Sequence, residues 1–238
     1  MPGDPNQPRG THVNLSGGDG AFAITEAAYY RFLAPELNEQ GQENGRPSNI
    51  RRLTFRRLGR AAELTYDGKY ALGAWGYTTR LNDLSQVDSA GNPVMRNGTY
   101  GLYALAEQML YHERGDPRQG LTLYARGGVT DPKVNRFGYF LSGGFIYTGL
   151  IPGRNSDQTG FGIATSWSGS HFEDGRRNVG QPVTGTTIAM EWTHSLYLTP
   201  SVIFQPDFQY IINPGSDQTI GNAFVAGFRL EIHMNWFK

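Results

Sequence analysis

Acids, amides and arginines recur at alternate positions in the C-terminal part of the chain. Gln205, Asp207 and Gln209 are each separated by one residue, and so are Arg229 and Glu231. Such side chains donate and accept hydrogen bonds and form ion pairs. Because successive side chains of a β-strand point to opposite faces, this spacing predicts polar groups gathered on one face of a sheet.

Turns between the predicted strands would bring some of these groups together. A tight turn would place Glu191 close to Asp207 or Gln209, and the next loop would place Arg229 opposite Gln205. Opposite and diagonal neighbours interact across a sheet, which predicts a cluster of Glu191, Asp207 and Arg229. Ion pairs that only stabilise a wall are the alternative for each residue. The full set of candidate site residues is Tyr124, Arg126, Glu191, Thr193, Tyr197, Gln205, Asp207, Gln209, Arg229 and Glu231.

Other chemistries lack the spacing that they need. The five histidines are scattered without an H-E-x-x-H motif, and the chain has no cysteine. His194 and Ser195 are adjacent, so on one strand they point to opposite faces and cannot act together as a base and a nucleophile. No G-x-S-x-G, P-loop or G-x-G-x-x-G motif joins a strand to a helix. We therefore predict no catalytic residue, no metal site and no cofactor.

The alternation that positions these groups is long and recurrent. In the last strand it sets an apolar side against a largely polar one, and the apolar residues are Phe224, Ala226, Phe228, Leu230, Ile232, Met234 and Trp236. Similar patterns predict about nine strands, near 20–32, 69–80, 99–111, 120–130, 137–150, 158–168, 186–198, 201–212 and 224–236. No stretch keeps a 3.6-residue period, so helices should be minor.

Strand length and loop length point to a membrane barrel. Strands of roughly 10–14 residues, tilted, are long enough to cross the hydrocarbon of a bilayer, whereas globular strands usually have about five or six residues. The connections alternate between mostly long and mostly short sets, as in outer-membrane barrels. We therefore predict an all-β, antiparallel transmembrane β-barrel over residues 20–238. Residues 1–19 should be an irregular loop, and 33–68 a long polar connection on the short-turn side.

Composition narrows the function classes. Lysine plus arginine and aspartate plus glutamate both number 21, so no net charge would attract nucleic acid. No apolar run reaches the roughly 18–20 residues of a membrane helix. The N-terminus, MPGDPNQPRGTHVNLSGGDG, lacks the basic start and apolar core of a signal peptide. A protein bound for the outer membrane needs a signal, so we expect this chain to be a fragment of a longer precursor.

Two long blocks, GGFIYTGLIPGR and QPDFQYIINPG, resemble the C-terminal half of the carbohydrate-selective porins, the OprB-like family. A weaker likeness extends through YGLYALAEQML and KYALGAWGYTTRL to DGAFAITEAAYY and covers most of residues 20–237. The resemblance implies a sixteen-stranded barrel that passes glucose and other sugars across the Gram-negative outer membrane. It implies about half of those strands here, and an eyelet lined by charged and polar residues.

The resulting hypothesis is a porin for passive, selective diffusion of glucose-type sugars, without catalysis. A half-barrel leaves two unpaired edges and a broad apolar face, so we expect outer-membrane lipid as a partner, together with a missing N-terminal half or further copies of the chain. One alternative is an outer-membrane barrel enzyme such as a lipid-modifying hydrolase, which needs a serine and a histidine on neighbouring strands. Another is a soluble β-sandwich binding module, which predicts short strands and two interdigitating faces.

Overall fold

The fold was analysed in a computed structural model that describes residues 20–32, 51–57, 60–114, 116, 119–183, 185–217 and 219–233. It contains one short α-helix, Ser170–Asn178 (α1), and one turn of 3₁₀ helix, Pro214–Ser216 (η1). The strands are Phe22–Phe32 (β1), Arg51–Arg57 (β2), Arg60–Val87 (β3), Pro93–His112 (β4), Gly120–Thr130 (β5), Phe137–Thr148 (β6), Gln158–Ser168 (β7), Thr186–Thr199 (β8), Val202–Ile212 (β9) and Ala223–Ile232 (β10). The described chain is therefore almost entirely β.

All strands join one antiparallel sheet. The order is β1-β3-β4-β5-β6-β7-β8-β9-β10, and β2 pairs only with the start of β3. The nine strands of this path are those that the alternation predicts, so the all-β antiparallel fold is confirmed. The β2–β3 hairpin falls inside 33–68, where the sequence indicated only a polar connection. Residues 1–19 and 33–50 lie outside the described residues.

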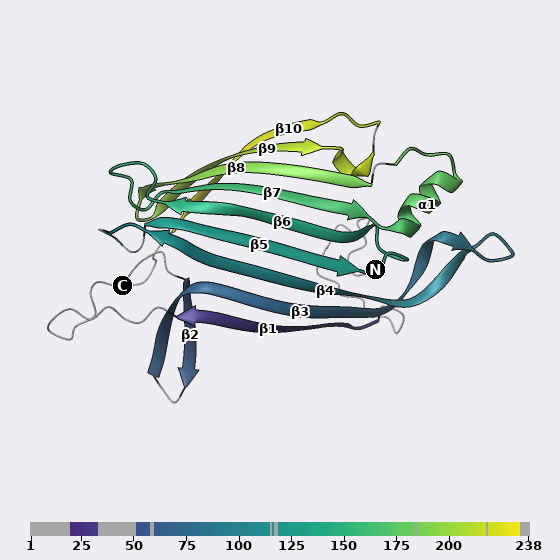
Figure 1. Ribbon diagram of the computed structural model, residues 1–238, viewed down its shortest axis with the longest axis horizontal. Helices are drawn as coiled ribbons and strands as arrows, with labels where there is room; N and C mark the ends of the chain where they lie inside the picture. The colour runs from purple at the N-terminus through teal and green to yellow at the C-terminus, as the bar shows by residue number, and fades with distance from the viewer. Residues whose placement is uncertain are drawn as a thin grey trace.

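The sheet is a single curved layer (Figure 1). Of the described hydrophobic side chains only Ala71 is fully buried, at 4% exposure. A soluble sandwich would instead pack two sheets face to face over an apolar core. The β-sandwich alternative is therefore wrong.

One end of the sheet carries a cap that the sequence did not predict. The β3–β4 hairpin extends beyond the other strands there, and α1 lies beside it (Figure 1). The helix forms within the polar loop 169–185, with Glu173 in its first turn and Arg177 in its last, which complements the helix dipole. Glu173 and Arg177 also form an ion pair of 2.7 Å one turn apart. Gly175 lets the helix approach the Leu84 carbonyl, which a Cβ would strike.

Candidate functional site

The strand register gathers the predicted polar residues on one face. Glu191 of β8 lies opposite Gln209 of β9. Arg229 of β10 lies opposite Gln205 of β9. Both pairings agree with the register that the sequence predicted, and directly opposite residues share a face. The polar face is therefore continuous across β8, β9 and β10.

The other face of the same strands is apolar and open. Phe228 on β10 is 73% exposed. Aromatic rings meet across this face, with Trp192 and Phe208 centroids 5.7 Å apart and Phe208 and Phe224 centroids 6.2 Å apart. Exposed apolar side chains continue over β3, β4, β6 and β7, among them Leu72, Tyr100, Leu102, Leu141 and Ile163. Soluble monomers rarely expose apolar patches beyond a few hundred Å², so this face suits lipid.

On the polar face, two carboxylates share one amide. The Gln209 Nε2 amide donates to Glu191 Oε2 at 3.2 Å and to Asp207 Oδ1 at 3.1 Å. Beside this pair, Gln205 Nε2 donates to Thr193 Oγ1 at 2.8 Å. The prediction that Glu191 lies close to Asp207 or Gln209 is therefore correct, and the Gln209 amide bridges the two acids.

Arg229 does not join these acids, which corrects the predicted cluster of Glu191, Asp207 and Arg229. Its guanidinium lies 3.1 Å from Glu231 Oε1, two residues along the same strand. A same-face neighbour two positions away competes with the diagonal Asp207, and the arginine side chain takes the nearer partner. Arg229 and Glu231 form a separate exposed ion pair on β10.

Tyr124 lies along the wall because the strands beside it carry glycines. Tyr124 of β5 pairs with Gly144 of β6, which pairs with Gly162 of β7. A Cβ at Gly144 would lie 2.8 Å from the Tyr124 hydroxyl, and a Cβ at Gly162 would strike the same oxygen. The tyrosine therefore extends over two strands toward Glu191 of β8, which pairs with Gly162. Arg126, two residues along β5, has its Cζ 5.4 Å from the ring centroid.

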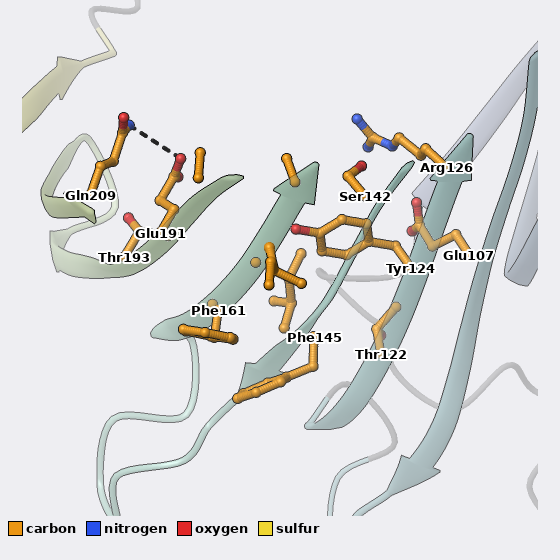
Figure 2. Close-up of a pocket in the computed structure, with 16 residues that line it drawn as sticks. Glu107, Thr122, Tyr124, Arg126, Ser142, Phe145, Phe161, Glu191, Thr193 and Gln209 are labelled. Carbon is orange, nitrogen blue, oxygen red and sulfur yellow. Dashed lines mark hydrogen bonds between the residues drawn. The ribbon is translucent and has the colours of Figure 1, made fainter. Parts of the chain in front are cut away.

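These residues surround a hollow of about 360 Å³ on the polar face (Figure 2). Five predicted site residues line it, namely Tyr124, Arg126, Glu191, Thr193 and Gln209. Glu107, Thr122 and Ser142 also line it and were missed. The remaining candidates, Tyr197, Gln205, Asp207, Arg229 and Glu231, do not line it. The hollow offers an aromatic ring, hydroxyls, an amide and charged groups, and apolar residues such as Phe145, Phe161 and Ile163 also line it. It therefore presents both hydrogen-bonding groups and apolar surface.

A second tyrosine forms a similar row on β4, and sequence reasoning missed it. The Tyr103 ring covers Gly73 of β3, and its hydroxyl donates to Glu26 Oε2 of β1 at 2.9 Å. Lys69 Nζ approaches the other Glu26 oxygen at 3.5 Å. This row is a closed network, in which the tyrosine hydroxyl already has a carboxylate partner.

The cap is fixed by a buried acid. Asp83 in the β3–β4 hairpin lies 2.8 Å from His171 Nδ1 of α1 and 2.9 Å from Arg96 Nε, and it accepts from the backbone N–H groups of Ser85 and Gln86. Burial alone would raise the pKa of Asp83. The hydrogen bonds from Gln86, His171, Ser85 and Arg96 outweigh burial and hold that pKa well below its usual range.

The helix is also held from the other side. Arg136, after β5, lies 4.8 Å above the Phe172 ring of α1, and Arg176 of α1 forms an ion pair of 3.1 Å with Asp217 after β9. Because α1 follows β7 yet packs against β3, the helix joins loops that belong to distant strands.

The sequence profile of the OprB family, described as carbohydrate-selective porin, matches residues 1–234. The chain belongs to this porin family. It is 27% identical to Porin B of Pseudomonas aeruginosa over 184 residues, which are 69% of this chain and 40% of Porin B. The fold is also similar to the high-pH structure of Pseudomonas putida OprB, with a TM-score of 0.68 at 22% identity. That likeness covers 95% of this chain and 50% of the solved one, so the chain spans about half of the porins that it resembles.

One set of residues in this porin-family chain approaches a catalytic arrangement. Thr159 Oγ1 lies 2.8 Å from His194 Nδ1, and Asp157 Oδ2 lies 3.7 Å from His194 Nε2. The sequence did not indicate this pairing of a hydroxyl and a histidine on neighbouring strands. Thr159 and His194 are each 8% exposed, and Arg154 occupies the Asp157 carboxylate at 2.6 Å. A buried hydroxyl leaves a substrate no approach, so the set is a structural network near the short β6–β7 and β8–β9 turns.

Over the described ranges, no three histidine, cysteine, aspartate or glutamate side chains come together in a way that could hold a metal ion. In the described part of the chain, no helix is long and apolar enough to cross a membrane.

Proposed function

We propose that the chain forms the wall of an outer-membrane channel through which neutral sugars diffuse passively, with glucose-type monosaccharides as the preferred solutes. The observation that carries this proposal is the division of β8, β9 and β10 into an exposed apolar face and a polar face, together with the hollow beside Tyr124. In a barrel wall the first face contacts lipid and the second lines water.

The polar face supports sugars over charged solutes. A channel must bind its solute strongly enough to admit it and weakly enough to release it. Around the hollow, two carboxylates, several hydroxyls, an amide and one arginine provide acceptors and donors for hydroxyl groups. The carboxylates outnumber the arginine, so the lining disfavours anions relative to neutral solutes. Membership of a family described as carbohydrate-selective supports the solute class. Passive diffusion needs no reactive group, and the buried Thr159–His194 pair gives the hydrolase alternative no support.

We propose also that the two free edges of the sheet are paired in the membrane. β1 and β10 end the strand order, and because nine antiparallel strands separate their outer edges, both run in the same direction. An odd number of added strands would complete a fully antiparallel wall, and a second copy in the same orientation would need two parallel seams. Further porin strands therefore fit the edges better than a second copy does.

Liposome swelling tests the channel. The full chain is refolded in detergent and reconstituted into liposomes. The entry rates of glucose, a disaccharide and a charged amino acid of similar size are then compared. We expect glucose to enter fastest, and Glu191→Gln to change the relative entry of the charged amino acid. Phe228→Leu, on the apolar face, is the matched control and should leave the ranking unchanged. Absence of glucose entry from well-inserted protein would contradict the proposal that this polypeptide conducts sugar.

Sedimentation without detergent tests the membrane assignment separately. The exposed apolar face should make the chain aggregate or precipitate in water. A monodisperse, detergent-free monomer would contradict the assignment.

A further inference from the structure

The hollow on the polar face contains one feature that plain wall stabilisation does not explain. Within the described residues, no hydrogen-bond partner is found for the Tyr124 hydroxyl. The side chain nevertheless crosses Gly144 and Gly162 on the next two strands, and Glu191 lies one strand further on. We propose that the Tyr124 ring is a stacking shelf for the C–H face of a pyranose sugar. This inference rests on the proposed function, because it names the class of sugar that the same wall would hold.

The glycines determine how the ring lies. A side chain at Gly144 or Gly162 would force the Tyr124 hydroxyl away from the wall. With hydrogens at both positions, the ring runs along the sheet and borders the hollow (Figure 2). A flat aromatic face is the complement of the apolar C–H face of a sugar ring, just as it is for other flat apolar groups.

Polar groups border the ring where the hydroxyls of a stacked sugar would project. Glu107 lies beside the start of the tyrosine side chain, and Glu191 lies beyond the far end of its ring (Figure 2). Ser142 adds a hydroxyl from β6. A pyranose with equatorial hydroxyls presents donors and acceptors around its rim and C–H groups on its faces, so one orientation satisfies both the ring and its polar border.

Arg126 completes the border. Its Cζ lies 5.4 Å from the Tyr124 centroid, and its side chain is exposed. A sugar that takes the place of the guanidinium over the ring would leave Arg126 at the rim as a hydrogen-bond donor. The hollow of about 360 Å³ is near the small end of ligand sites, which favours a monosaccharide over a longer sugar.

The shelf makes a prediction that hydrogen bonding alone does not make. Sorbitol carries nearly the same hydroxyls as glucose but has no ring, so it has no fixed C–H face. A wall that recognises only hydroxyls would treat the two alike. A wall with a stacking shelf would favour the pyranose.

The test is glucose binding to the full chain folded in detergent micelles, titrated by saturation-transfer NMR with sorbitol as the acyclic counterpart. We expect glucose to bind more tightly than sorbitol. Tyr124→Leu should weaken glucose binding roughly three- to tenfold, the range for loss of one aromatic contact, and leave sorbitol unchanged. Tyr103→Leu is the matched control, because it removes a tyrosine from the same face outside the hollow, and glucose binding should persist.

Gly162→Ala gives a second route if Tyr124→Leu does not fold. Its methyl would displace the Tyr124 hydroxyl, while the nearest backbone atom lies 4.0 Å away. Gly227→Ala on β10, with nothing within 4 Å, is its control. Unchanged glucose affinity in both Tyr124→Leu and Gly162→Ala would overturn the shelf, as would an equal loss in Tyr103→Leu. Glucose entry that fails in liposomes while binding still depends on Tyr124 would instead remove the channel and leave the shelf.

Discussion

Tyr103 and Tyr124 occupy equivalent positions in two rows of the same wall, yet of the two only Tyr124 lines the hollow described above. Tyr103 crosses one glycine and its hydroxyl reaches Glu26, which Lys69 also approaches. Tyr124 crosses two glycines, Gly144 and Gly162, so the next carboxylate lies one strand further away. The Tyr103 row, with one glycine, is therefore a closed hydrogen-bonded network. The Tyr124 row, with a second glycine, leaves a hollow between the tyrosine and the next carboxylate.

The largest expected difference lies in the glycines. A Cβ at Gly144 would strike the Phe161 backbone carbonyl of the neighbouring strand, whereas the three atoms nearest to a Cβ at Gly73 all belong to the Tyr103 side chain, which can turn. Gly144→Ala should lower the free energy of unfolding by about 1–3 kcal/mol, as overpacking does, and Gly73→Ala by less. Guanidinium titration in detergent, followed by tryptophan fluorescence, measures both. Equal losses of unfolding free energy would show that both rows tolerate a methyl group at their glycines equally, and would contradict the difference between the two tyrosine rows.

A smaller difference is expected from the hydroxyls. Tyr103→Phe removes a hydrogen bond to a carboxylate and should cost about 1 kcal/mol of unfolding free energy, at the low end because the site is solvent-accessible. Tyr124→Phe should cost less than about 0.5 kcal/mol, since its hydroxyl has no partner among the described residues. The same titration compares them. A larger loss for Tyr124→Phe would mean that its hydroxyl belongs to a structural network.

The smallest stability effects should come from the two cations beside the tyrosines. Lys69→Met and Arg126→Met should each change the free energy of unfolding by no more than about 1 kcal/mol, the usual contribution of a solvent-accessible ion pair for Lys69 and of a solvent-accessible cation–π contact for Arg126. Their effects on glucose titration should differ, because Arg126 borders the hollow and Lys69 does not. Loss of glucose affinity in Lys69→Met but not in Arg126→Met would place the solute beside Tyr103 and contradict its proposed place beside Tyr124.

The strands could be predicted from the sequence because a two-residue period has only one structural meaning when it persists for ten residues or so. The same period predicted which face Glu191, Gln205 and Arg229 occupy. It could not choose between diagonal and same-strand partners, so it assigned Arg229 to Asp207 where Glu231 is nearer.

The Tyr103 row escaped prediction for a different reason. The faces of 20–32 and 99–111 are less cleanly divided, and the role of Gly73 depends on which residue of a paired strand lies opposite it. Small residues at alternate positions of 158–168 were visible in the sequence, but their purpose needed the register with Tyr124. The cap helix α1 was hidden because most of its nine residues are polar and because its contacts are made with segments far away in the sequence.

The most direct test of the central claim is the rate at which glucose enters liposomes relative to sorbitol, for the unchanged chain and for Tyr124→Leu. The two solutes differ little in size and are both neutral, so a simple polar pore would pass them at similar rates. We predict that the unchanged chain passes glucose faster and that Tyr124→Leu brings the two rates together. Equal rates in the unchanged chain, or a glucose preference that survives Tyr124→Leu, would contradict it.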